Sequence, residues 1–366
     1  GDSTAVVSLL YDKKSSSSYL HSNISYVEPL GEKWVLQVGT RGSWSSSRSD
    51  NIATNGLDGT YNDYYTNITD NESAVLSGGV TTQYRSGNHN LSFGFSANMN
   101  ENVNYVKNLG TETTAGKREW QFTLAPDLDY SYSKDSFSTN VYYFGSTQQP
   151  SNSQMSPTLN LGNPTMISAG NIYLKQYMYH YLGGYVRHNN RENFSYVNAR
   201  FSGNMEQNAI VQASWFDRNA IRYSVPVNSR KPSYSLSGTL TYNQPFGEKR
   251  YWTFSTYADV SYSASAGYQA KEGLEGMDIE EFDYNDFMSV FWGNSSGDRF
   301  YSGDSGFSES KMSTLHYALD LGLKYQRDRF NASVHAYGRN QISKYSLDPD
   351  ANADTWMHSY SFDAMY

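Results

Sequence analysis

Apolar and polar residues alternate strictly along much of this chain. From Trp120 to Tyr132 every even position is apolar or aromatic, and every odd position except Ala125 is polar. Residues 91–99 and 315–325 alternate in the same way, with the apolar residues at odd positions. Period-two alternation is what a β-strand requires when one face meets an apolar medium and the other meets water. The pattern therefore predicts long two-faced β-strands.

The length of the alternating segments separates two kinds of all-β protein. Many run for about ten residues and carry aromatic ends, and Trp34 and Trp44 stand ten positions apart on one face. A strand tilted through a bilayer needs roughly 9–11 residues, and aromatic residues form girdles at both membrane rims. A soluble β-sandwich or propeller also alternates, but its strands usually run about 5–6 residues. The pattern therefore favours an all-β fold, an antiparallel transmembrane β-barrel, over the soluble alternative.

We expect about 14 strands, and their ranges are 16–28, 33–46, 73–86, 89–107, 118–133, 136–147, 172–187, 193–204, 208–224, 233–244, 250–266, 313–327, 329–342 and 357–366. Tight turns alternate with long connections at 47–72, 108–117 and 267–312. Outer-membrane barrels have short turns at one end and long loops at the other. We therefore expect residues 1–366 to form one outer-membrane β-barrel domain, with 47–72 and 267–312 at the same, outward end.

Composition narrows the class of protein further. The chain has 33 Tyr, 17 Phe and 7 Trp, which is 16% aromatic residues, and this abundance argues against disorder. No run of about 18 apolar residues predicts a membrane-spanning helix. The absence of cysteine excludes disulfide scaffolds and thiolate metal sites. A net charge of −8 without a basic stripe argues against a nucleic-acid partner.

One acidic run is a weak candidate for a cation site. Seven carboxylates without an intervening basic residue occupy 272–286, and the metal candidates among them are Asp278, Glu280, Glu281 and Asp283. Carboxylate oxygens suit hard cations, but the spacing does not fit an EF-hand, and a solvated loop is the alternative. The histidines show no metal-ligand spacing, and no phosphate-binding loop is present. We therefore expect no enzyme activity and no cofactor.

Aromatic residues in the expected long loops are candidates for ligand contact. They are Tyr61, Tyr64, Tyr65, Phe282, Tyr284 and Trp292. Such rings stack on sugars or on the rings of a metal chelate. The alternative is that they pack the loops against one another.

Local motifs resemble those of a known family. Tyr26-Val27-Glu28-Pro29-Leu30 resembles the Tyr-x-Glu-Pro-Leu of TonB-dependent-receptor-like outer-membrane barrels. The same family carries a Pro-Ser-x-x-Gln-Leu, Asn-Pro-Leu and Gly-Asn-Pro-x-Leu-Lys-Pro-Glu signature. Similar residues occur here in that order, at Pro150–Met155, Gly162–Pro164 and Gly170–Lys175. The chain departs from the signature at Ile172-Tyr173 and at Gln176, where the family has proline.

The resemblance implies a function and partners. It implies the outer-membrane barrel of a transporter that imports a bulky nutrient, either a metal chelate or an oligosaccharide. Outer-membrane lipid, an energy-coupling periplasmic protein and a surface lipoprotein would be its partners. Complete receptors have 22 strands and a plug, which this sequence does not show, so we expect a part of a larger barrel. The alternative function is a plug-less structural or adhesive surface protein.

Overall fold

The computed structural model describes residues 8–108, 110–115, 120–155, 159–163, 165–270, 284, 288 and 306–366. They form 18 strands of one connected sheet. The bounds are β1 Leu9–Pro29, β2 Trp34–Asn55, β3 Tyr61–Ser86, β4 His89–Asn108, β5 Thr111–Ala115, β6 Gln121–Lys134, β7 Phe137–Gln148, β8 Leu159–Asn163, β9 Met166–Ala169, β10 Tyr177–Asn189, β11 Tyr196–Gln207, β12 Ile210–Phe216, β13 Arg222–Asn228, β14 Ser233–Phe246, β15 Trp252–Ala270, β16 Phe307–Arg327, β17 Phe330–Tyr345 and β18 Ala353–Met365. The helices are α1, Asn152–Met155, and the 3-10 turn η1, Pro349–Ala351. Within this part of the chain no helix is long and apolar enough to cross a membrane.

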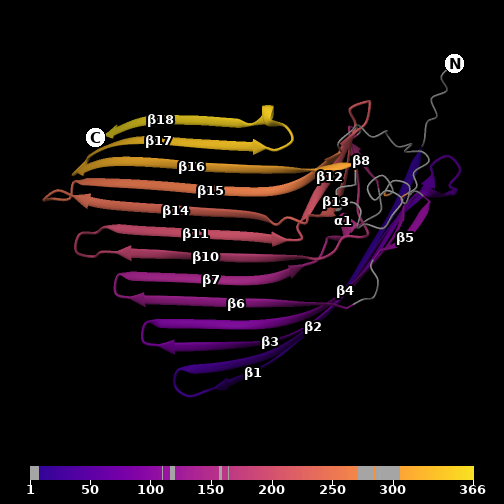
Figure 1. Cartoon of the computed structure of the whole chain (residues 1–366), viewed down its shortest axis with the longest axis horizontal. Coiled ribbons are helices and arrows are strands. Elements are labelled where there is room, and N and C mark those ends of the chain that lie inside the picture. Colours follow the sequence, from indigo (N-terminus) through magenta and orange to yellow (C-terminus); the bar gives the residue numbers. More distant parts are fainter. Residues whose placement is uncertain are drawn as a thin grey trace.

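The long strands form an antiparallel wall. Each pairs with the next along the chain, except that β4 pairs with β6, β7 with β10 and β11 with β14. Figure 1 shows the tight hairpins gathered at one end and α1, β5, β8, β12 and β13 at the other. We call these the tight-turn end and the outward end, because short turns are periplasmic and long loops face outward in such barrels.

Three expected connections differ in the structure. Residues 47–72 are not a long loop, because β2 and β3 extend through them and meet at a short turn, 56–60. This polar stretch lies beyond the alternating apolar part of both strands, so backbone pairing alone extends them there. Part of the expected loop 108–117 forms β5, which pairs with β4. The connection predicted at 267–312 begins later and ends earlier than expected, because β15 extends to Ala270 and β16 begins at Phe307.

One expected strand was also wrong. Residues 208–224 do not cross the wall, because they fold into β12, a turn and the first three residues of a second short strand, β13. Asp217 forms the turn between them: its carboxylate accepts hydrogen bonds from the backbone N–H groups of Asn219 and Ile221, at 2.8 and 2.9 Å. An aspartate that bonds the backbone two residues ahead makes an Asx turn, which ends a strand.

The two edges of the wall do not pair with each other. Among the described residues, β1 pairs only with β2 and β18 pairs only with β17. The side chains of β18 are exposed along its whole length, and those of β1 along nearly all of it. The expected strand at 357–366 therefore exists, as part of β18, but it does not close the sheet against β1.

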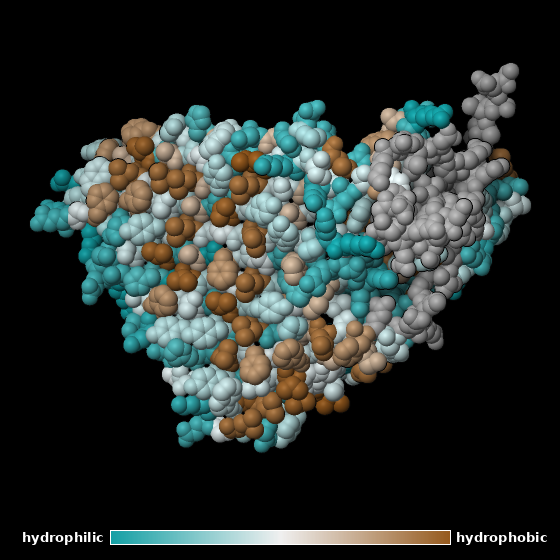
Figure 2. Space-filling model, in the orientation of Figure 1, coloured by the Kyte–Doolittle hydropathy of each residue, from teal (hydrophilic) through white to brown (hydrophobic). Residues whose placement is uncertain are grey.

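The two faces of the wall carry different chemistry, as the alternation predicts. On β16, Leu319, Leu321 and Leu323 are exposed, whereas Ala318 on the opposite face is 5% exposed. On β4, Phe93, Phe95 and Met99 are exposed in the same way. Figure 2 shows apolar residues gathered in a band across the strands, with hydrophilic residues at both strand ends. The odd residues of 91–99 and 315–325 thus lie on the apolar face, and that face meets lipid in a barrel of this kind.

Aromatic rings mark two rims of the apolar face. Trp252 and Tyr325 contact each other near the tight-turn end, with ring centroids 4.8 Å apart, and Tyr317 and Trp356 lie 5.7 Å apart toward the outward end. Leu321 stands midway between the two tyrosines on β16. Further ring pairs are Trp34–Tyr84, Tyr132–Phe137 and Phe246–Trp252 near the tight turns, and Tyr234–Tyr262 at the other rim. Their separation confirms the apolar band that Trp34 and Trp44 predict.

The opposite face carries ionisable groups in pairs. His316 Nδ1 lies 3.0 Å from Asp259 Oδ2 on the neighbouring strand, and His335 Nδ1 lies 3.5 Å from Asp320 Oδ1. Asp320 stands on β16 between two leucines that point to the other face, as the sequence predicts. A reversed register would place these charges in lipid, at a cost of about 2–4 kcal/mol for a basic residue at mid-bilayer. This polar face is therefore the lining of the barrel.

Candidate functional site at the outward end

Short strands from two connections assemble into one unit at the outward end, which we call the cap. The β7–β10 connection supplies β8 and β9, and the β11–β14 connection supplies β12 and β13. Strand β13 runs parallel to β9, with Tyr223 opposite Ile167, and β12 runs parallel to the end of β15, with Ala213 opposite Tyr268. The cap is therefore tied directly to a wall strand.

The cap has a hydrophobic core of its own. Trp215 and Tyr223 are 1% and 2% exposed, and their rings stack with centroids 4.8 Å apart. The other buried members are Ile167, Ala169, Ala213, Val225, Val227, Tyr268, Tyr284, Met288 and Phe307. Burial of this kind contributes roughly 1.5–3 kcal/mol for each large side chain. The cap is thus a folded unit and not a set of solvated loops.

The Gly170–Lys175 segment of the family-like signature joins the two connections. The side chain of Asn171, which is 1% exposed, donates to the carbonyl of Pro226 at 2.9 Å. Asn228 accepts from the backbone N–H of Lys175 at 2.8 Å and donates to its carbonyl at 2.9 Å. Each asparagine satisfies backbone groups that a buried segment would otherwise leave unpaired. The motif therefore has a structural role here.

Tyr284 belongs to this core and does not present its ring to a ligand. It is 3% exposed, its hydroxyl donates to the carbonyl of Gly170 at 3.1 Å, and the same oxygen accepts from the N–H of Ile172 at 3.1 Å. Burial raises the pKa of this phenol above its ordinary value, so it stays neutral. Tyr284 therefore packs the connections against one another, which was the alternative to ligand contact.

A bulge near the start of β3 displays the first group of candidate aromatics. The pairing of β2 with β3 jumps from Asn51–Asn67 to Ala53–Asn62, so 63–66 lie outside the ladder. Thr66 replaces a missing ladder bond, because its hydroxyl accepts from the N–H of Ala53 at 3.1 Å and donates to the carbonyl of Asn62 at 2.7 Å. Bulges of this kind redirect side chains at the rims of barrels.

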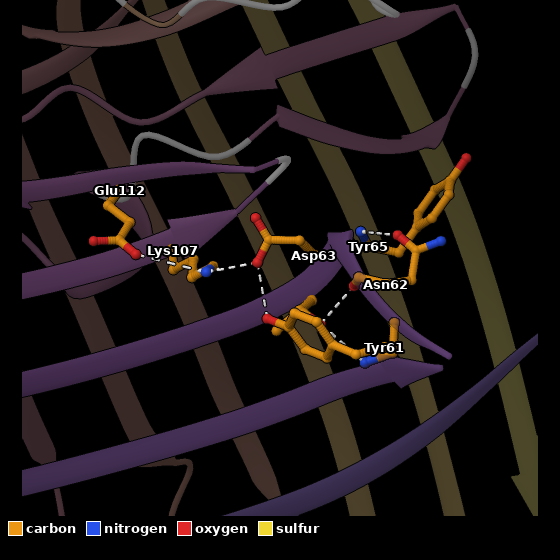
Figure 3. Close-up of polar contacts among 8 residues, drawn as sticks. Tyr61, Asn62, Asp63, Tyr65, Lys107 and Glu112 are labelled. Atoms are coloured by element: carbon orange, nitrogen blue, oxygen red, sulfur yellow. Dashed lines mark hydrogen bonds and ion pairs between the residues drawn. The ribbon is translucent and has the colours of Figure 1, made fainter. Parts of the chain in front are cut away.

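The bulge places a polar cluster at the outward end of β3 and β4 (Figure 3). Asp63 Oδ1 accepts from the Tyr61 hydroxyl at 2.9 Å and lies 2.6 Å from Lys107 Nζ. Lys107 also lies 3.6 Å from Glu112 Oε1 on β5. The Lys107 ammonium holds the pKa of Asp63 below its ordinary value, and the Asp63 carboxylate raises the pKa of Lys107. The cluster therefore carries one fixed positive charge between two carboxylates.

The Asp63–Lys107 pair predicts a pH dependence. Because the pKa of Asp63 is lowered in the folded protein, its ionised form stabilises the bulge above the unfolded pKa, and the contribution is lost as the pH falls through the lowered value. We expect Asp63→Asn to speed amide hydrogen exchange in 61–68 at neutral pH relative to the unmodified protein. The difference should disappear in acid, where Asp63 is protonated in both. A difference that is equal at both pH values would contradict the pairing.

The candidate aromatics are therefore divided among several environments. Tyr61 and Tyr65 are 53% and 40% exposed and remain accessible at the outward end. Tyr64 packs edge-on against Tyr65, with centroids 5.1 Å apart. Phe282 and Trp292, together with the metal candidates Asp278, Glu280, Glu281 and Asp283, lie outside the described residues. Within the described part, His, Asp and Glu form no group of three that could hold a metal ion.

Sequence reasoning missed Lys107 and Glu112 as members of these assemblies, and it noted Asn171 only as part of the family-like signature. The local sequence around Lys107 indicates no partner, because Lys107 meets Asp63 only through the pairing of β3 with β4 and the bulge in β3. The one available signal was the presence of a charged residue near the outward end of both β3 and β4, at Asp63 and Lys107.

The fold agrees with the comparison with protein families. The model of the outer membrane protein beta-barrel family matches residues 4–301, and the chain belongs to this family. It is an outer-membrane β-barrel protein. No curated protein matches the sequence.

The comparison with solved structures found the following similarities. The copper transporter OprC is 9% identical with a TM-score of 0.46, and the match covers 89% of this chain and 51% of OprC. The alcaligin receptor FauA of Bordetella pertussis is 9% identical with a TM-score of 0.40, covering 97% and 54%. The Serratia marcescens hemophore receptor HasR, solved with its hemophore HasA and heme, is 11% identical with a TM-score of 0.35, covering 96% and 68%. The chain thus spans about half the length of the first two.

Proposed function

We propose that this chain forms the barrel wall of an energised outer-membrane transporter that imports a bulky nutrient, a metal chelate or an oligosaccharide. The observation that carries the proposal is the folded outward end, where a cap with its own core and an exposed aromatic and charged cluster stand over a polar lining. A protein that only filled the membrane would not need ordered structure there, since long connections in compact domains are usually functional or disordered.

The chemistry of the cluster fits such a ligand. Tyr61 and Tyr65 supply exposed rings that can stack on sugar or chelate rings. Lys107 and its two carboxylate partners supply donors and acceptors beside them. Membership of the outer-membrane barrel family supports passage through a lumen. Within the proposal, an energy-coupling periplasmic protein and a surface lipoprotein are the partners.

A structural or adhesive surface protein is the second candidate. The observation that favours it is the number of hydrogen bonds within the cap. The side chains of Asn171, Asn228 and Tyr284 form hydrogen bonds with backbone groups of the two connections. A rigid cap presents a constant surface to a partner. Transport requires energy and adhesion does not, which separates the two candidates.

The test compares uptake by cells that produce the complete natural protein with uptake by cells that lack it. Growth on haem, a ferric siderophore, copper or a maltooligosaccharide as limiting nutrient identifies the ligand. We expect a protonophore to abolish uptake, and Tyr61→Ala with Tyr65→Ala to weaken binding about fivefold, the ratio for about 1 kcal/mol of ring stacking. Phe216→Ala, another exposed aromatic at the outward end, is the control. Equal growth of both cells on all four nutrients would reject transport in favour of the surface role.

A further inference from the structure

The wall has an opening between β6 and β7 near the outward end. These strands pair from Lys134–Phe137 up to Asp127–Phe144 and then separate. Beyond that point β6 continues to pair with β4 as far as Gln121, and β7 continues to pair with β10 as far as Gln148. The backbone of 121–126 and that of 145–148 therefore do not pair with each other across the opening.

Pro126 accounts for the position of the split. Proline has no N–H to donate, so it cannot continue the ladder toward β7. Its ring also occupies the space beside Gly145, where an added Cβ would lie 3.1 Å from Pro126 Cδ. The separation is therefore encoded in the sequence.

The opening is an apolar groove of about 580 Å³. Phe122 and Leu124 from β6 line one side and are 62% and 52% exposed. Thr147 and Met178, which are paired on β7 and β10, line the other. The hydroxyl of Thr123, also at the groove, is buried and has no hydrogen-bond partner. The volume falls within the roughly 300–1,000 Å³ of typical ligand pockets.

The depth of the groove indicates what fills it. Phe122 is opposite Met99, which is opposite Leu76, and Trp44 at the rim is opposite Ala74. Phe122 thus lies two residues inside the outward rim of the apolar face, and the groove is continuous with the lipid-facing surface. Unpaired backbone groups are costly at this depth, so an occupant with an apolar chain and hydrogen-bonding atoms near its end fits best.

We propose that this groove binds one acyl chain of an outer-leaflet lipid, with the ester or amide region of the lipid beside the unpaired backbone of β6 and β7. The lipid thereby fills the split that Pro126 creates in the wall. The groove is distinct from the proposed ligand cluster, because Phe122, Leu124, Thr147 and Met178 lie on the membrane-facing side of the wall and none of the cluster residues lines it.

The test uses a phosphatidylcholine with a photoactivatable diazirine in its acyl chain, added to outer membranes that contain the protein. We expect at least about threefold more label on peptides with Phe122, Leu124 or Met178 than on the uninterrupted wall at 315–323, a ratio equivalent to about 0.7 kcal/mol. Equal labelling of the two regions would overturn the proposal. Absence of label from the groove peptides would also overturn it, since a protein segment would then fill the space.

Two substitutions locate the label. Thr147→Phe fills the groove and should reduce its labelling to the level of the control wall. Thr82→Phe makes the same change on the apolar face between the paired strands β2 and β4, and it should leave groove labelling unchanged. Labelling that survives Thr147→Phe at full strength would overturn the site. If Thr147→Phe does not assemble, the ratio in the unmodified protein decides alone.

Discussion

Trp215→Ala should unfold the cap while leaving the wall intact. The side chain is 1% exposed and stacked on Tyr223, and replacing a buried tryptophan with alanine costs about 3–5 kcal/mol. Because each 1.4 kcal/mol is a factor of ten, amide hydrogens in 210–228 should exchange at least about a hundredfold faster. Hydrogen exchange followed by mass spectrometry measures this, and the wall peptide 315–325 should be unchanged.

Phe216→Ala is the matched control for the cap. Phe216 is the next residue on β12, but it points to the other side and is 46% exposed. Its removal should change exchange in 210–228 only slightly, since surface substitutions away from special features are usually within about 0.5 kcal/mol. Similar effects of the two substitutions would show that Trp215 is not part of a core.

Leu321→Arg should prevent or strongly weaken insertion into the membrane. Leu321 lies on the apolar face of β16, midway between the rings of Tyr317 and Tyr325. An arginine at mid-bilayer costs about 2–4 kcal/mol on the lipid face of a barrel. The fraction of protein that reaches the heat-resistant, slowly unfolding form in phospholipid vesicles measures the loss.

Tyr257→Arg introduces the same charge at the same height on the other face. Tyr257 is opposite Asp320, whose carboxylate can pair with the new guanidinium, and it is 44% exposed. This variant should assemble as well as the unmodified protein. If Tyr257→Arg assembles worse than Leu321→Arg, the assignment of the two faces is reversed.

The sequence by itself determined the local structure of the wall and the chemistry of its faces. Alternation at 91–99 and 315–325 is a local property, because side-chain direction along a strand changes with every residue, and it identified the apolar and polar faces correctly. The aromatic ends of the strands likewise identified the rims.

Only the tertiary structure decided which outward-end residues meet. The sequence predicts Tyr284 to be an aromatic residue of a loop. Its burial depends on contacts with Gly170 and Ile172, which are more than a hundred residues away. The sequence also predicts a loop for the polar parts of β2 and β3. Outside the membrane a strand does not need an apolar face, so the alternation that indicates a strand is absent there. Lys107 and Asp63 become partners through the register of β3 with β4 and the bulge that carries Asp63. Register and the docking of β9 on β13 are long-range contacts, which a local pattern does not encode.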